Sequence, residues 1–208
     1  MNLTAQIRSA ILDGKYPPGS ILSQTDLARE YAVSRIPIRD ALLGLAADEL
    51  VEVLPGRGAR VVLLSAKELE EVFHLRIMLE CDLLRCGVSN ASKEAKAEVE
   101  YVLRRSSLEA GRPGWHIGDW DFHRTLYEAA ERPRQLAMVD HLRKICVIHA
   151  RKYTALATNT KRWLDDHEMI AAAYVAGHSD AASALLANHI RASLDWLLSG
   201  GGEMAEGS

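Results

Sequence analysis

The chain has 208 residues, of which 48% are hydrophobic and 25% charged, and its formal net charge is −3. This length allows one large or two small domains with ordinary buried cores, and the composition is that of a globular protein. Because neither a long apolar run nor a secretory leader pattern is found, we expect a cytoplasmic protein without a membrane partner. The cysteines form no CxxC pair, which favours reduced thiols over a disulfide framework or a zinc knuckle (Cys81, Cys86, Cys146).

The first 64 residues show the element order of a winged helix. Apolar residues at helical spacing predict a helix over residues 3–13, and Ser23 and Ser34 are placed as N-caps of a second and a third helix. The third helix is expected to run to about Asp48, with Pro37 in its first turn, where a missing N–H costs little. Two short apolar strands, 51–54 and 59–63, flank a hairpin turn at 55–58. Residues 1–64 are therefore predicted to form a winged helix-turn-helix domain.

From residue 65 onward the sequence shows only helical patterns. A long helix is expected to begin at Ser65, and five more follow, separated by Gly, Pro, Ser and Asn breaks (91–109, 116–130, 134–157, 160–176, 179–198). The low-complexity end, residues 200–208, is predicted to be disordered. The predicted fold class is mostly α, with the winged helix followed by an all-α antiparallel bundle over residues 65–199.

The third helix carries two arginines at its N-terminal end. Arg35 and Arg39 are four residues apart and so share a face, while Ile38 and Ala41 face the domain core. Because this end of a recognition helix enters the major groove, the arginines are suited to pair with guanine or to clamp phosphates. Arg57, in the turn between the strands, offers a third contact to the DNA backbone or minor groove. Taken singly, each arginine is better explained as a solvated surface residue, and only the combination with the element order favours DNA binding.

Residues 7–61 resemble the DNA-binding domain of the GntR family of regulators. The matching pieces include Pro18-Gly19-Ser20, Val33-Ser34-Arg35, Pro37 to Leu42, and Gly56 to Ala59. The resemblance implies that Arg35, Arg39 and Gly58 contact DNA, with Arg57 as a helper. Ile36 stands where the family often has Thr, which replaces a hydroxyl contact with an apolar one to a thymine methyl.

The second half of the chain contains four residues of metal-ligand type on predicted helices. Asp119 and His123 are four residues apart and share a helix face, and His167 and His189 lie in two later amphipathic helices. If these side chains converge inside a bundle, they form a site for a first-row divalent metal. Spacing between helices does not prove convergence, so scattered surface or core histidines remain the alternative at this point.

Residues 65–198 resemble the FCD effector domain of the FadR subfamily of GntR regulators. The matching pieces are Leu75-Arg76, Leu79-Glu80, Asp119 to Leu126, His167 to Ile170, and Gly177 to Ala182 followed by His189. The resemblance implies that Asp119, His123, His167 and His189 bind one divalent metal, for which zinc or nickel suits the donors best and manganese or iron is possible.

Two further residues are candidates for effector binding. Arg76 could pair with a ligand carboxylate, or instead form an ion pair with Glu80, four residues away. His149 could line the pocket or be an ordinary core polar group.

The sequence therefore predicts a ligand-responsive transcriptional regulator that acts as a repressor, and not an enzyme. A homodimer is expected to bind a double-stranded operator, and a small organic acid is expected to bind at the metal. Two alternatives remain open: a regulator whose metal is purely structural, and a metal-dependent hydrolase.

Overall fold

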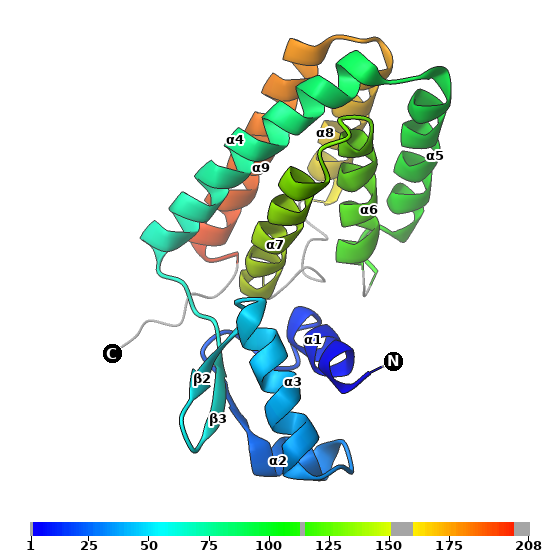
Figure 1. Ribbon diagram of the computed structural model, residues 1–208. Coiled ribbons are helices and arrows are strands. Elements are labelled where there is room, and N and C mark those ends of the chain that lie inside the picture. The colour runs from blue at the N-terminus through cyan, green and yellow to red at the C-terminus, as the bar shows by residue number, and fades with distance from the viewer. Residues whose placement is uncertain (1, 113–114, 151–159, 202–208) are drawn as a thin grey trace. The chain divides into compact units, whose positions relative to one another are not determined.

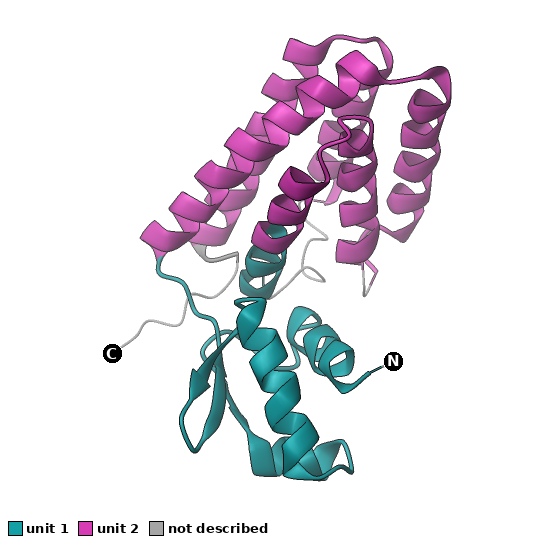
Figure 2. Cartoon of the chain, viewed as in Figure 1, with its two compact units in different colours: residues 1–65, 143–151 teal, residues 66–142, 152–208 magenta. Residues whose placement is uncertain are grey.

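The structure is a computed structural model in which residues 2–112, 115–150 and 160–201 are described. The chain divides into two compact units (Figure 2). The first contains residues 1–65 and 143–151, and the second contains residues 66–142 and 152–208. Within the described ranges, no helix is long and apolar enough to cross a membrane.

The first unit is a winged helix, which confirms the predicted fold class. Its helices and strands follow in the order α1 (Leu3–Leu12), β1 (Ile21–Ser23), α2 (Gln24–Glu30), α3 (Arg35–Ala47), β2 (Val51–Leu54) and β3 (Gly58–Val61). The strands form one antiparallel sheet in the order β1-β3-β2 (Figure 1). The hairpin of β2 and β3 was predicted, whereas β1 was missed because three residues are too few to show an alternating pattern.

Capping and burial explain why these helices form where they do. The Ser23 side chain accepts the backbone N–H of Asp26 at 3.4 Å and caps α2. Ser34 stands at the N-cap of α3 but makes no capping hydrogen bond there. The apolar faces of α1 and α3 meet in one core (Ile7, Ile11, Ile38, Ala41, Leu42, Leu45). This core holds α3 in place and leaves its other face to solvent.

Gly58 begins β3 at a point where the sheet leaves no room for a side chain. Its φ of +121° lies in the left-handed region, and a Cβ there would stand 2.0 Å from the backbone oxygen of Leu22. We expect Gly58→Ala to destabilise the first unit by about 2–4 kcal/mol, because backbone strain and overpacking add. Gly56→Ala is the control, since Gly56 has a φ of +73° and open space around it. Urea unfolding that shows equal losses for the two variants would contradict this account.

The second unit is an all-helical bundle. Its helices are α4 (Ala66–Asn90), α5 (Lys93–Glu109), α6 (Trp115–Glu128), α7 (Pro133–His149), α8 (Thr160–Val175) and α9 (Ser179–Trp196). Helices α4 and α9 run side by side in Figure 1. A π-helical turn, Leu197–Gly201, follows α9, so residues 200 and 201, the first two of the segment predicted to be disordered, are helical in the structure. Residues 202–208 of that predicted tail lie outside the described residues.

Helix α7 differs from its prediction in two ways. It was expected to run over residues 134–157, but it ends at His149, and residues 151–159 lie outside the described part of the chain. In addition, its last turns group with the first unit, and Ile148 is a member of that unit's core. The period of the apolar residues indicates a buried helix face but not the element that covers it.

Candidate metal centre

The four predicted ligands lie on three helices of the second unit. Asp119 and His123 are one turn apart on α6, His167 is on α8, and His189 is on α9. All four side chains are buried, and His123 and His167 are completely inaccessible to solvent. Burial of so many polar groups is costly unless they meet partners or a metal.

The ligand atoms of these residues converge. Asp119 Oδ1 is 3.6 Å from His167 Nε2 and 3.9 Å from His123 Nε2. His167 Nε2 is 3.3 Å from His189 Nε2, and the three histidines offer nitrogen atoms within 4.8 Å of one another. Metal–nitrogen bonds of about 2.1 Å put neighbouring ligands of a tetrahedral ion about 3.4 Å apart, so these separations suit a single ion.

Asp166 orients one of the histidines. His189 Nδ1 lies 3.2 Å from Asp166 Oδ2, and the His189 ring holds the pKa of that carboxyl below its usual range. A ring that donates from Nδ1 to a carboxylate presents the lone pair of Nε2 to a metal. Sequence reasoning missed Asp166. A carboxylate directly beside His167 was the available signal, but only the fold shows that it faces His189.

A second chain of contacts leads to His123. Tyr127 donates its hydroxyl to Glu80 Oε2 at 2.7 Å, and the same hydroxyl lies 3.5 Å from His123 Nδ1. Since the hydroxyl hydrogen is used toward Glu80, its oxygen is left to accept from His123 Nδ1, which again directs Nε2 to the centre. Arg76 Nε donates to Glu80 Oε1 at 2.7 Å, so the ion pair that the sequence left open is present and buried. Tyr127 was not predicted as a site residue.

The donor set fits a divalent transition metal. Three imidazole nitrogens and one carboxylate oxygen suit zinc or nickel, and manganese or iron can also accept them. Asp166 and the Glu80–Tyr127 pair supply the outer hydrogen bonds that metal-binding histidines need. Asp119, His123, His167 and His189 are the residues that would hold the ion, which would supply a Lewis-acidic point for a ligand carboxylate.

The candidate effector residue His149 lies in the first unit. Its Nε2 accepts the backbone N–H of Leu64 at 2.9 Å, and its Nδ1 is 2.8 Å from the carbonyl oxygen of Ile145. Both ring nitrogens therefore contact backbone groups, and the Leu64 N–H lies in the linker between β3 and α4. A role for His149 in effector binding stays a prediction.

The predicted DNA-contacting side chains are exposed on the first unit. Arg35, Ile36 and Arg39 are exposed at the start of α3, and Arg57 is exposed in the turn between β2 and β3. Ile36 has 73% of its surface exposed and is therefore accessible to a partner of the first unit. Gly58 is buried, so its packing against Leu22 requires glycine whatever its role at DNA.

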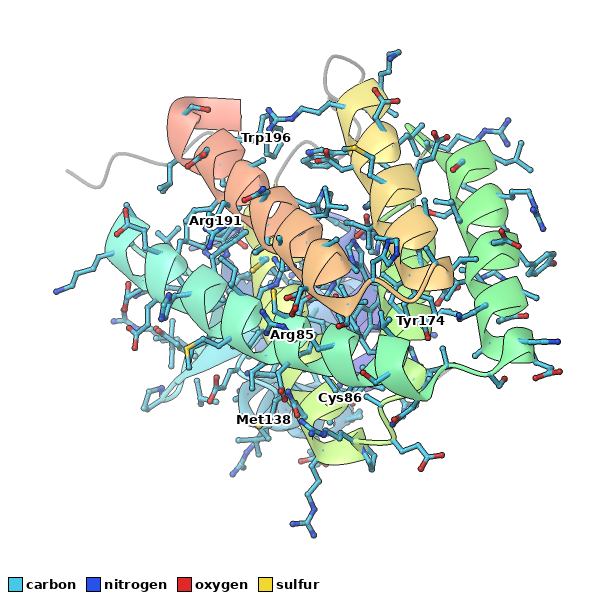
Figure 3. All side chains as sticks on the ribbon, turned by 90° about the horizontal axis from the view of Figure 1, so that it is seen from above. Arg85, Cys86, Met138, Tyr174, Arg191 and Trp196 are labelled. Atoms are coloured by element: carbon cyan, nitrogen blue, oxygen red, sulfur yellow. The ribbon has the colours of Figure 1, made fainter. Side chains whose placement is uncertain are left out.

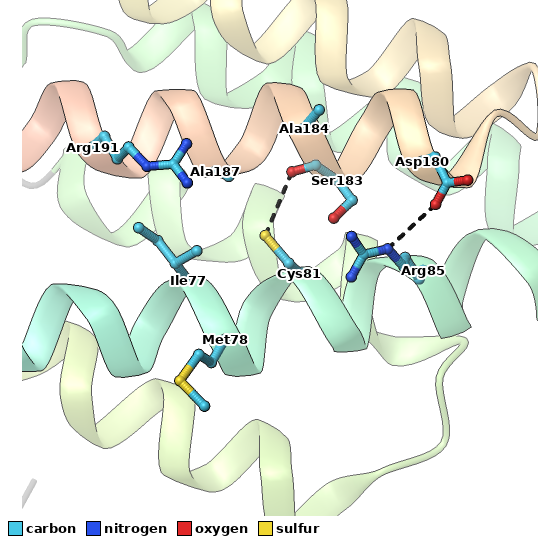
Figure 4. Close-up of a pocket in the computed structure, with 9 residues that line it drawn as sticks. All are labelled: Ile77, Met78, Cys81, Arg85, Asp180, Ser183, Ala184, Ala187 and Arg191. Carbon is cyan, nitrogen blue, oxygen red and sulfur yellow. Dashed lines mark hydrogen bonds and ion pairs between the residues drawn. The ribbon is translucent and has the colours of Figure 1, made fainter.

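A separate hollow of about 290 Å³ lies between α4 and α9 (Figure 4). Arg85 pairs there with Asp180 at 3.4 Å, and the thiol of Cys81 lies 3.4 Å from the carbonyl oxygen of Ser183. Burial raises the pKa of the Cys81 thiol, which keeps it protonated and unreactive. The hollow does not include any of the four converging residues.

Comparison with known families and proteins matches both units. The family described as bacterial regulatory proteins, gntR family, matches residues 2–61, and the FCD domain matches residues 71–192. An HTH-type transcriptional regulator of Agrobacterium vitis is 34% identical over 60% of this chain and 76% of its own. The HTH-type transcriptional repressor GlaR of Escherichia coli is 27% identical over 88% of this chain and 89% of its own. The structure of E. coli McbR/YncC has a TM-score of 0.78 at 21% identity, covers 96% of this chain and 98% of its own, and supports the fold.

Proposed function

The chain belongs to the GntR family of bacterial regulatory proteins and carries an FCD domain, and from this premise we propose that its helical domain binds one divalent metal and a small carboxylate effector at that metal. As a member of this family it is a DNA-binding transcriptional regulator and not an enzyme. The hydrolase alternative is therefore set aside.

The convergence of Asp119, His123, His167 and His189 carries the proposal. These side chains come from three helices, and each histidine is buried. An ion held by them ties α6, α8 and α9 together, and a carboxylate that binds the ion changes the spacing of those helices. Such a ligand shifts the DNA affinity only to the extent that it binds one arrangement of the protein better than another.

DNA binding is assigned to Arg35 and Arg39 on α3, with contributions from Ile36 and from Arg57 in the turn between β2 and β3, on a homodimer that reads a two-fold symmetric operator. A single winged helix covers few base pairs, and two copies related by symmetry double the contact area and set the spacing of the half-sites. The exposed cluster at the start of α3 supports this assignment.

Replacing Arg35 or Arg39 with alanine should weaken operator binding by roughly 1–3 kcal/mol if the side chain reads a base. The operator is first selected from random duplex DNA, and binding is then followed by fluorescence anisotropy at fixed salt. Arg104→Ala is the control, since Arg104 is an exposed arginine of α5 and its loss changes the net charge equally. Unchanged affinity of both recognition-helix variants, with the fold intact by circular dichroism, contradicts the assignment.

One measurement distinguishes a metal that binds the effector from a metal that is purely structural. If the metal only holds the bundle together, small carboxylates leave the melting temperature and the operator affinity of the zinc-loaded protein unchanged. If it holds the effector, at least one acid raises the melting temperature and changes the operator affinity of the same sample.

A further inference from the structure

Three of the four tryptophans gather beside the candidate metal centre, one on each helix that supplies a ligand. Trp115 is four residues before Asp119 on α6, and Trp163 is four residues before His167 on α8. Trp196 is seven residues after His189, at the last residue of α9 (Figure 3). Spacings of four and seven residues place each tryptophan on the same helix face as the ligand of its helix.

Ring contacts join these residues into one wall, which we define as Trp115, Trp163 and Trp196. The ring centroids of Trp115 and Trp163 are 6.1 Å apart, and those of Trp163 and Trp196 are 5.9 Å apart. The wall reaches the centre itself, because the Trp163 ring lies 6.3 Å from the His189 ring. Trp196 is only partly buried, so the wall extends from the metal ligands to the surface of the bundle.

A second, independent observation points to a ligand. Trp115 has only 2% of its surface exposed, and its indole N–H is buried without a hydrogen-bond partner among the described residues. A buried N–H without an acceptor is unfavourable, and buried tryptophans usually find a partner. An effector with an oxygen at this position supplies the missing acceptor.

We propose that the effector is an aromatic acid whose carboxylate lies at the metal, whose ring packs along the tryptophan wall, and whose opposite end carries an oxygen that accepts the Trp115 N–H. The inference rests on the proposed function. Trp115 is four residues from Asp119, a rise of about 6 Å, and a benzene ring with substituents at opposite ends spans a similar length. Aromatic rings gain more from such a wall than saturated rings of equal size.

The test uses zinc-loaded, full-length protein and three probes: benzoate, cyclohexanecarboxylate and para-hydroxybenzoate. Zinc content is measured first, and acid binding is then followed by calorimetry and tryptophan emission. We expect benzoate to bind about fivefold more tightly than cyclohexanecarboxylate. Para-hydroxybenzoate should bind about fivefold more tightly again, through the added hydrogen bond.

Three variants test which tryptophan is responsible for each binding preference. Trp196→Leu should remove the preference for the aromatic ring, and it is chosen because a partly buried residue is safest for the fold. Trp115→Phe keeps a ring and should remove the advantage of para-hydroxybenzoate alone. Trp120→Phe, on α6 but outside the wall, should change neither.

Equal binding of benzoate and cyclohexanecarboxylate by zinc-loaded protein overturns the inference while the metal assignment stands. Binding preferences that survive in Trp196→Leu overturn it as well, and so does zinc-loaded protein that binds none of the three acids. Protein that takes up no zinc refutes the proposed function, and the inference fails with it.

Discussion

Replacing Arg76 with methionine should lower the stability of the helical unit by about 3–5 kcal/mol, because it leaves the Glu80 carboxylate in the bundle without its ion-pair partner. Glu80 has no exposed surface, and Arg76 is exposed by only 6%. The guanidinium also stacks on Phe73, with its Cζ 5.0 Å from the ring centroid. Methionine keeps an unbranched apolar chain of similar length, so the charge is the main loss.

The double variant Arg76→Met/Glu80→Leu is the matched control. Removing both charges replaces the buried pair with apolar groups, which is often neutral for stability, but the leucine also leaves the buried Tyr127 hydroxyl without its acceptor, at a cost of about 1–3 kcal/mol. We therefore expect chemical denaturation to give a large loss for the single variant and a smaller loss for the double variant. A single variant within about 1 kcal/mol of the wild type would mean that the pair is solvated or loosely held.

The same pair shows what the sequence could and could not decide. Four-residue spacing on a helix placed Arg76 and Glu80 on one face, but it left two partners for the arginine, a ligand carboxylate and Glu80. The structure shows the ion pair. The spacing contains no information on burial, and burial is what makes the pair energetically important.

The predicted fold followed from local patterns, and its departures have non-local causes. Helical periodicity, serine caps and the hairpin turn located α1 to α6, α8 and α9 within a few residues. Strand β1 is stabilised by pairing with β3, some 35 residues later in the chain, so its own three residues carry little signal. The end of α7 is grouped with the first unit for a similar reason, since Ile148 packs in a core formed by residues far away in sequence.

The candidate site could be predicted only with the help of the family resemblance. The pair Asp119 and His123 is a local pattern, but its convergence with His167 and His189 depends on how three helices pack. The supporting residues Asp166 and Tyr127 were missed, because a hydrogen bond between helices has no fixed spacing in sequence. Their contacts with ring Nδ1 atoms nevertheless explain why the Nε2 atoms point to one place.

Removing one ligand by His189→Ala should strongly lower metal uptake and, with it, the response to the effector. The wild type is expected to bind one zinc or nickel ion per chain, and at a free metal concentration near one hundred times Kd the gain in stability is about 2.7 kcal/mol. For a domain of this size that gain corresponds to a rise in Tm of roughly 5–10 °C. The variant retains three ligands and loses the one that Asp166 orients, so most of this rise should disappear.

His178→Ala is the control for this measurement. His178 stands at the N-cap of the same helix, α9, where it is exposed and makes no capping hydrogen bond with its side chain. Metal content after mild chelation is measured by native mass spectrometry, and thermal unfolding is recorded with and without added metal. His178→Ala should match the wild type in both measurements, and operator binding by Arg35 and Arg39 should survive in metal-free His189→Ala. Equal metal content in wild type and His189→Ala, or a wild type that takes up neither zinc, nickel nor manganese, would show that the four side chains do not form a metal centre.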